Sequence, residues 1–475
     1  MKKQRVQHPK VVVIGAGSLF FGRQAIWQMV HSEHLNHGTL ALVDTDPARL
    51  KKMAQLARMV VEHTGVPLKI EASVDRKKVL AGADFVVLSF ADRSVKYRGI
   101  DCAVSLKHGI RMCSGDTIGP GGIFRTLREF PVIMQCVADI TKLCPNAWVI
   151  NYINPTAANG IGLQRFAPHL KTFALCDGLH MPHIKKVYAK RAGIIQEEAQ
   201  FDRNCDRNFD LRIAGVNHFT WMLKAAYKGK DVMPAIAASI HRDAVRVDER
   251  GFLAPKELTA GGDAGAKLSF NNSINYALYQ AFGKVPTCVP HTKEYVRFWQ
   301  GLGKTPEAIP PLAIWETEAR YKRHADMWKQ VDGFISGKTP IADYMTTFGP
   351  DHATDIIENM VGGLKKPFYV NTTNRGAVTN MADDAFLEML CDIDMNGPKP
   401  RPVGEFPRGL RGLQEQVLDT HELTAQAAVT CDRAILRRAM LTDPLVSSIT
   451  DADAIIRELL AAERDVLPKK WFAKK

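Results

Sequence analysis

The sequence predicts an α/β fold, in which a doubly wound parallel sheet at the N-terminus is followed by a mixed α+β domain. Strands that are covered on both faces of a sheet show continuous apolar runs instead of alternation. Segments of helical length separate the runs, which gives the β-α-β-α order of such a sheet. A glycine-containing turn follows the first run. The runs lie at residues 11–14, 40–43, 85–88 and 148–150.

Local signals place the helices between these strands. A helix is expected at residues 24–30, directly after the glycine turn. A second helix begins at Asp46-Pro47, because Asp is a good N-cap and Pro suits the first helical position. Gly65 is placed to end that helix.

The alternation of strand and helix is lost in the second half of the chain. Two more strands, at residues 173–175 and 211–216, precede this change. The remainder mixes a helix at 313–331 with a short strand at 368–370. Since 475 residues exceed what one hydrophobic core usually spans, we expect two domains. Their predicted bounds are 8–205 and 206–475.

Composition excludes several classes of protein. The hydrophobic share of 46% and the charged share of 24% are typical of a globular protein, and no apolar run is long enough for a membrane span. The formal charge is +13, but basic residues form no block of the kind that binds nucleic acid. The nine cysteines show no CxxC pair. We therefore expect reduced thiols, a cytoplasmic location and neither a membrane nor a nucleic-acid partner.

The turn after the first strand is of dinucleotide-binding type. Gly15 permits a tight turn, Gly17 lets the backbone approach a pyrophosphate, and Ser18 follows just before a helix N-terminus. Asp44, at the end of the second strand, is placed to accept hydrogen bonds from a ribose and so favours NAD over NADP. The third glycine of the fingerprint is absent, and Gly22 comes two residues later. The alternative is a plain turn beside a solvated Asp, but together the signals predict a Rossmann-like NAD site.

Short polar clusters follow three other strands. Asn151 and Asn154 follow one, Cys176-Asp177 another, and Asn217-His218 the last. Ligands collect at the carboxyl ends of strands in an open α/β sheet, so these clusters are expected near one crevice. Cys176 with His218 would form a mixed sulfur and nitrogen site for Mn, Fe, Co, Ni or Zn. The alternative is that Cys176 is a small apolar residue of the core and that His218 is a core histidine whose ring nitrogens have hydrogen-bond partners.

Four motifs occur in order along the chain: DTIGPGGIFR at 116–125, NYINPT at 151–156, Cys176-Asp177, and GVNHF at 215–219. Together they resemble glycoside hydrolase family 4, the NAD- and divalent-metal-dependent α-glucosidases, α-galactosidases, uronidases and 6-phospho-glycosidases, which do not follow the rule of two catalytic carboxylates. The resemblance continues through residues 371–380 and 423–445.

The resemblance implies a redox elimination. NAD would oxidise the C3 hydroxyl of the terminal sugar, and the ketone would acidify the C2 proton. A base would remove that proton, and the C1–O bond would break. Water would then add and the hydride would return to C3. A cation, Mn²⁺ first, held by Cys176 and His218 would polarise the C3 oxygen and stabilise the enolate.

Other roles also come from the resemblance. Asn154 and Asn217 are expected to bind the sugar, and Asp177 to be the general acid, with a structural N-cap as the alternative. The segment where relatives carry their base holds no Asp here. His291 and Tyr276 are the favoured bases, and Tyr279 and Glu294 are the other candidates.

The substrate stays open at this stage. Residues 116–119 resemble the α-galactosidase, α-glucosidase and uronidase branch, which favours an α-linked hexoside or uronide. Arg98 and Arg125 could clamp a carboxylate or a phosphate, although Arg98 could instead pair with Asp101 or a neighbouring carboxylate of the protein. Family members assemble as dimers or tetramers, so a homo-oligomer is expected. The competing hypotheses are an NAD-dependent dehydrogenase of a sugar or hydroxy acid, and a non-catalytic NAD or sugar sensor.

Overall fold

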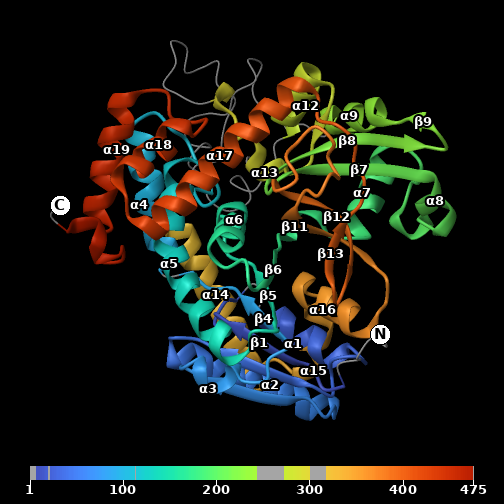
Figure 1. Ribbon diagram of the computed structural model, residues 1–475. Coiled ribbons are helices and arrows are strands. Elements are labelled where there is room, and N and C mark those ends of the chain that lie inside the picture. The colour runs from blue at the N-terminus through green and yellow to red at the C-terminus, as the bar shows by residue number, and fades with distance from the viewer. Residues whose placement is uncertain are drawn as a thin grey trace.

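The computed structural model describes residues 7–19, 22–91, 93–112, 114–242, 272–299 and 317–473. Of residues 177, 272, 273, 289, 290 and 299 only the backbone is described. Within these ranges one sheet of 13 strands runs through the molecule, and helices lie on both of its faces (Figure 1). No described helix is long and apolar enough to cross a membrane.

Six parallel strands form the N-terminal part of the sheet. They are β1 (Lys10–Ile14), β2 (Thr39–Val43), β3 (Lys69–Ser73), β4 (Phe85–Leu88), β5 (Trp148–Asn151) and β6 (Lys171–Ala174). Their order is β3-β2-β1-β4-β5-β6, and every pairing is parallel. This is the strand order of a dinucleotide-binding fold, and the direction of winding reverses between β1 and β4. The predicted doubly wound, Rossmann-like sheet is therefore confirmed.

Antiparallel strands continue the same sheet. They are β7 (Phe209–Val216), β8 (Phe219–Tyr227), β9 (Lys230–Asp231), β10 (Val285–Pro286), β11 (Pro367–Thr373), β12 (Phe386–Asp394) and β13 (Gly397–Pro400). From β6 the order continues through β11, β12, β7, β8 and β10. The sheet therefore crosses the predicted boundary near residue 205 without a break. The division into two domains stays a prediction.

Helices cover the two faces of the parallel strands, whose residues alternate between two cores. Val12 and Ile14 face one core, and Val11 and Val13 face the other. The first core is covered by α3 (Lys77–Leu80), α4 (Ser94–Lys107), α5 (Gly119–Leu143), α6 (Thr156–Phe166), α17 (Arg408–Thr430), α18 (Arg433–Thr442) and α19 (Ile449–Ala462). The second is covered by α1 (Gly22–His31), α2 (Pro47–Thr64), α14 (Thr317–Ile335), α15 (Ile341–Thr347) and α16 (His352–Gly362).

A third, smaller core packs on the antiparallel strands. It is formed by α7 (His183–Arg191), α9 (Met233–Arg242) and α12 (Asn272–Phe282), which lie beside β7 and β8 (Figure 1). The short elements η1 (Asp177–Leu179), η2 (Glu198–Gln200), α8 (Arg203–Asn208), α13 (Val289–Thr292), η3 (Arg297–Trp299) and η5 (Lys469–Phe472) complete the described chain.

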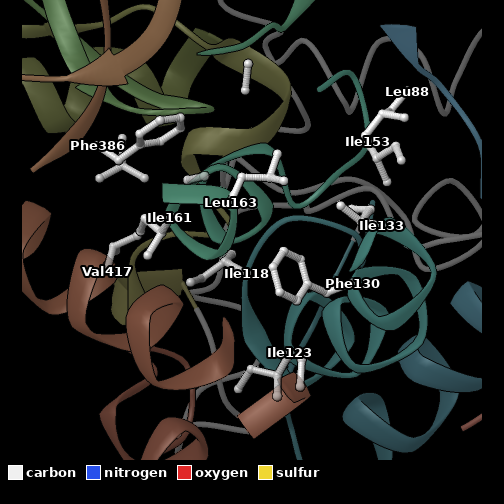
Figure 2. Packing of buried hydrophobic residues seen from close by; sticks show 14 of the residues in the cluster. Leu88, Ile118, Ile123, Phe130, Ile133, Ile153, Ile161, Leu163, Phe386 and Val417 are labelled. Carbon is white, nitrogen blue, oxygen red and sulfur yellow. The ribbon is translucent and has the colours of Figure 1, made fainter. Parts of the chain in front are cut away.

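The first core joins segments that are far apart in the sequence. Phe130 of α5, Ile161 of α6 and Val417 of α17 belong to one buried cluster, and Figure 2 shows them with Phe386 of β12. The C-terminal helix α17 thus packs against both α5 and α6. This contact matters for function, because α5 and the turn before α6 carry residues of the site described below.

The local predictions are largely confirmed. β1, β2, β4 and β5 lie where the apolar runs predict strands. Asp46 caps α2 by accepting from the N–H groups of Ala48 and Arg49, and Gly65 ends the helix at φ +69°. Strand β3 was not expected, because it lies at the sheet edge and its sequence, KIEAS, has no continuous apolar run.

Candidate active site

The glycine turn lies at the point where the sheet reverses its winding. Gly15 has φ +95°, and a Cβ at this position would lie 2.6 Å from the Ser89 carbonyl oxygen at the end of β4. The Gly17 N–H donates to Asp44 Oδ2 at 2.8 Å, and the Ser18 N–H donates to the Gly15 oxygen at 2.9 Å. A side chain at either glycine would fill the turn. The geometry fits a cradle for a dinucleotide.

Gly22 takes over the packing role of the missing third glycine. A Cβ on Gly22, the first residue of α1, would lie 2.5 Å from the Ala16 carbonyl oxygen. The helix can approach the turn this closely only with glycine there. Gly22 thus allows the close packing of helix and turn for which the fingerprint uses its last glycine, although it is shifted by two residues.

Cys176 and His218 meet in the structure. Cys176 follows β6 and His218 lies in the turn between β7 and β8, yet Cys176 Sγ is 2.8 Å from His218 Nε2. Both residues are buried. The sequence argument for this proximity was wrong in one respect. Strand β7 is antiparallel to its neighbour β12, so the rule for carboxyl ends of parallel strands does not place His218, and the hairpin turn does.

The pair offers a thiol and an imidazole to a divalent cation. Burial lowers the pKa of His218 well below its usual value, so the ring is neutral and its nitrogens can act as ligands. Its Nδ1 has no hydrogen-bond partner among the described residues. The described residues contain no group of three or more metal-ligating side chains. The donor set therefore fits a cation with two protein ligands and open positions for water or substrate oxygens.

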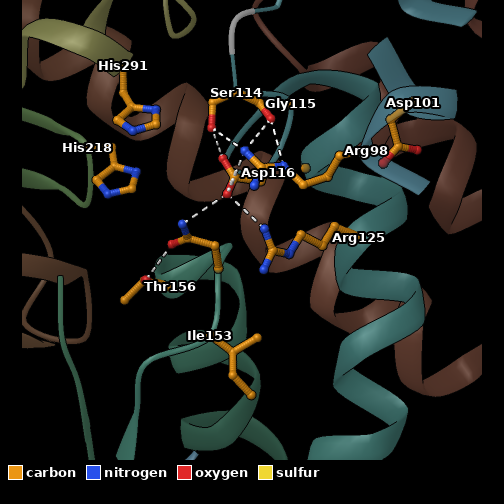
Figure 3. Close-up of polar contacts among 12 residues, drawn as sticks. Arg98, Asp101, Ser114, Gly115, Asp116, Arg125, Ile153, Thr156, His218 and His291 are labelled. Carbon is orange, nitrogen blue, oxygen red and sulfur yellow. Dashed lines mark hydrogen bonds and ion pairs between the residues drawn. The ribbon is translucent and has the colours of Figure 1, made fainter. Parts of the chain in front are cut away.

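Asp116 is the centre of a polar cluster beside this pair (Figure 3). Its Oδ2 accepts from Arg125 Nη1 at 2.8 Å and pairs with Arg98 Nη2 at 3.2 Å. Asn154 Nδ2 donates to the same oxygen at 3.3 Å, and the Ser114 hydroxyl donates to Oδ1. The two guanidinium groups outweigh desolvation and hold the pKa of Asp116 well below its usual range. Asp116 is thus a permanent carboxylate.

The alternative for Arg98, a pairing with Asp101 or a neighbouring carboxylate, is confirmed in its second form, because Arg98 pairs with Asp116. Asp101 instead binds Arg128 of α5, with Nη2 to Oδ2 at 2.8 Å, and Arg98 also donates to the Ser114 carbonyl oxygen. The two arginines expected to contact substrate, Arg98 and Arg125, therefore share one carboxylate.

His291 lies beside His218. Its ring stacks on His218, with centroids 4.1 Å apart and planes 7° from parallel (Figure 3). His291 Nδ1 lies 3.4 Å from Glu294 Oε2. Glu294 also accepts from the Ser114 N–H at 2.8 Å, so it links the histidine to the Asp116 cluster. Two base candidates, His291 and Glu294, are therefore brought to the site, and of these His291 lies against His218.

The remaining predicted residues lie differently. Tyr276 on α12 stacks on His241 of α9, and its ring contacts among the described residues are with His241 and Tyr279. The Asp177 side chain lies outside the described residues. Cys176 caps η1 by accepting from the Gly178 N–H, and the alternative role of Asp177 as an N-cap stays a prediction. The catalytic roles of Tyr276 and Asp177 stay predictions.

Comparison with known proteins decides the family. The model of family 4 glycosyl hydrolases matches residues 10–191, and the model of the C-terminal domain of that family matches residues 213–446. The chain belongs to family 4 of the glycosyl hydrolases. It is therefore an enzyme that hydrolyses O-glycosidic bonds, as the motifs predicted.

Curated family 4 relatives match along nearly the whole chain. An α-galactosidase of Bacillus subtilis is 28% identical over 468 residues, which cover 97% of this chain and 99% of the relative. An α-galacturonidase of Lachnoclostridium phytofermentans is 26% identical over 476 residues, 98% of each chain. A maltose-6′-phosphate glucosidase of Fusobacterium mortiferum is 23% identical, with 96% and 98% covered. These names span neutral, acidic and phosphorylated sugars.

Solved family 4 structures share the fold. A 6-phospho-α-glucosidase from gut microorganisms, solved with NAD and Mn²⁺, has a TM-score of 0.73 at 19% identity and covers 97% of this chain and 99% of its own. A 6-phospho-β-glucosidase from Thermotoga maritima, solved with manganese, NAD⁺ and glucose-6-phosphate, has a TM-score of 0.72 at 20% identity, with 97% and 99% covered.

Sequence reasoning about this family 4 enzyme missed several residues that build the site. Asp116 was visible in the motif at 116–125, and its charge between two arginines was the signal available. Glu388 and Gln414 had no such signal, since they lie about 170 and 195 residues beyond the turn that they contact. Only the fold brings them to His218.

Proposed function

We propose that this family 4 glycosyl hydrolase cleaves a small O-glycoside with NAD and a divalent cation, Mn²⁺ first, as resident cofactors. The contact between Cys176 Sγ and His218 Nε2 at 2.8 Å carries the proposal. The contact brings a buried thiol and a neutral imidazole together beside the Asp116 cluster. The glycine turn follows β1, a strand of the same sheet. Relatives of the same fold were solved with these two cofactors.

The residues that would hold the cofactors fall into two groups. Gly15, Gly17, Ser18 and Asp44 would hold NAD, and Cys176 with His218 would hold the cation. When bound, these groups would supply a hydride acceptor for a sugar carbon and a Lewis acid for the oxygen on that carbon.

We assign the base to His291. Its Nδ1 faces the Glu294 carboxylate, which orients the ring and leaves Nε2 as the nitrogen that can accept a proton. Stacking on His218 keeps that nitrogen beside the metal pair. Asp177 is proposed as the acid that gives a proton to the leaving oxygen. Asn154, held by Asp116, would donate to or accept from a sugar hydroxyl.

The charge of the Asp116 cluster favours an uncharged sugar. Arg98 and Arg125 bind the same carboxylate, so this cluster carries a net charge of only about +1. A bidentate clamp for phosphate would need a guanidinium group that is not already turned toward Asp116. We therefore propose an α-linked hexoside as the first substrate and an α-linked uronide as the second.

A panel of glycosides tests the reaction. The purified enzyme is assayed with NAD, Mn²⁺ and a thiol reductant on α- and β-linked glucosides, galactosides, uronides and their 6-phosphates. We expect sugar release without net NADH, and exchange of the C2 hydrogen with deuterated solvent. Net NADH in proportion to substrate would instead indicate a dehydrogenase. NAD binding without turnover on any substrate would indicate a sensor, and retention of the C2 hydrogen during hydrolysis would exclude the elimination.

Two variants test the metal ligands. Cys176→Ser and His218→Ala are each expected to abolish the metal-dependent activity, because each removes one of the two proposed ligands of the cation. NAD affinity, measured by fluorescence, is expected to stay as in the unmodified enzyme. Chelation is expected to inactivate the enzyme and added Mn²⁺ to restore it. Full activity in either variant would remove that ligand from the assignment.

Setting and assembly belong to the same proposal. We propose a cytoplasmic enzyme, because a reducing compartment keeps the Cys176 thiol available as a ligand. We propose a homodimer or homotetramer, as for other members of the family. Light scattering of the purified chain checks the assembly, and a monomer at micromolar concentration would exclude it.

A further inference from the structure

The turn that presents His218 has a strained backbone. His218 has φ +64°, in the left-handed region that residues with a side chain seldom adopt. It is the second residue of the two-residue connection between β7 and β8. Glycine would adopt this φ without strain, but a histidine occupies the position. Such a conformation persists only where the surroundings hold it in place.

Three side chains from separate elements hold this turn. Gln414 of α17 spans its ends, because Oε1 accepts from the Val216 N–H at 2.7 Å and Nε2 donates to the Phe219 oxygen at 3.0 Å. Tyr295, which follows α13, donates its hydroxyl to the Asn217 oxygen at 2.9 Å. These bonds satisfy backbone groups that a turn of the chain alone would leave unpaired.

Glu388 of β12 completes the set. Its carboxyl group accepts from Asn217 Nδ2 at 3.3 Å. The Asn217 amide is therefore turned into the protein, although the sequence analysis assigned it to the sugar. That sugar contact stays a prediction. Glu388, Gln414 and Tyr295 are all at least 98% buried, so water cannot replace these bonds.

We infer that Gln414, Tyr295 and Glu388 form a turn clamp, a set of positioning residues that holds residues 216–219 so that His218 Nε2 faces Cys176 Sγ. The clamp thereby sets the affinity of the site for its cation, an inference that rests on the proposed function. Groups that orient a metal ligand typically contribute a factor of 10 to 100 to metal affinity. Since α17 also packs on α5 and α6, the clamp ties the metal pair to the elements that carry Arg125 and Asn154.

Direct measurement of Mn²⁺ binding tests the clamp. The dissociation constant is obtained from the electron paramagnetic resonance signal of free Mn²⁺, titrated into the full-length enzyme without NAD or substrate. Tyr295→Phe removes one hydroxyl and keeps the ring that stacks on Phe219 at 5.1 Å. Gln414→Leu removes both bonds at the ends of the turn. We expect each variant to raise the Mn²⁺ dissociation constant about 10-fold or more.

Tyr344→Phe is the matched control. Tyr344 is also fully buried and its hydroxyl also donates to a backbone oxygen, that of Arg23, but it lies on α15. We expect this variant to lower the melting temperature as much as Tyr295→Phe does, with an unchanged Mn²⁺ dissociation constant. If Gln414→Leu does not fold, Glu388→Leu replaces it, because it removes the acceptor of the Asn217 amide, and the same loss of affinity is expected.

The outcomes separate the clamp from the metal site. Wild-type affinity in Tyr295→Phe and Gln414→Leu would overturn the clamp and leave the proposed function intact. An equal loss of affinity in Tyr344→Phe would also overturn it, since the effect would then be one of general stability. A wild-type enzyme that binds no Mn²⁺ would overturn the metal site and the clamp with it.

Discussion

Replacement of Arg128 by methionine tests the buried ion network that joins the C-terminal helices to the site. Arg128 of α5 binds Asp101 of α4 at 2.8 Å and Glu463, which follows α19, at 2.6 Å. The Arg128 side chain is 2% exposed and both carboxylates are fully buried. Burial and the neighbouring Asp101 raise the pKa of Glu463 well above its usual value, so Glu463 favours its neutral form and Asp101 is the carboxylate that forms the ion pair with Arg128.

Loss of the arginine is expected to lower the free energy of unfolding by about 3–5 kcal/mol, because two carboxyl groups would remain buried without a cation. Urea unfolding followed by circular dichroism measures the change. The control is Arg437→Met, which breaks a bidentate ion pair with Asp453. The side chains of Arg437 and Asp453 are 47% and 46% exposed, so this variant is expected to change the free energy of unfolding little. The triple variant Arg128→Met, Asp101→Leu, Glu463→Leu is expected to recover most of the loss. A loss below about 1 kcal/mol in Arg128→Met, or one equal to that of the control, would refute the reasoning.

Two further predictions concern the cofactor turn and pH. Gly17→Ala is expected to weaken NAD binding measured by fluorescence, because its Cβ would lie 2.7 Å from Asp44 Oδ2; unchanged affinity would remove Gly17 from the cofactor site. Asp443 accepts from the Gly119 N–H, yet burial raises its pKa to about 7. The folded state then binds more protons than the unfolded state between about pH 4 and 7, so this group's contribution is present at low pH and is lost as pH rises through 7. Asp443→Asn is therefore expected to reduce the dependence of the free energy of unfolding on pH in that window by up to about 1.4 kcal/mol per pH unit. Urea unfolding at several pH values measures this dependence. An unchanged pH dependence would contradict the raised pKa of Asp443.

Much of the parallel half of the molecule could be predicted from local sequence. Apolar runs mark β1, β2, β4 and β5, because a strand buried on both faces must be apolar throughout. Asp46 and Gly65 mark the ends of α2, because helix ends need a side-chain acceptor and a residue that tolerates positive φ. Strand β3 could not be predicted in this way, because a strand at the edge of the sheet need not be apolar throughout.

Half of the site could also be predicted. Cys176 and His218 were singled out by residue type and by motif, and the structure brings them within 2.8 Å. The reason given for their proximity was incomplete, because the antiparallel direction of β7 can be known only from strand pairing. The sequence also could not decide between Tyr276 and His291 as the base, because that choice depends on which of them lies close to His218 in the folded chain. Both lie in one stretch of sequence, but only His291 stacks on His218.

The sequence by itself determined the family, the glycine turn with Asp44, and the identity of the metal pair, because each rests on residue types at short spacing. Tertiary structure alone decided that Arg98 and Arg125 share Asp116, and that Gln414 and Glu388 hold the turn of His218. The physical reason is that buried polar groups must find partners wherever the fold supplies them. Gln414 and Glu388 lie 198 and 171 residues from the groups of the turn that they bind, and such contacts leave no periodic or local trace in the chain.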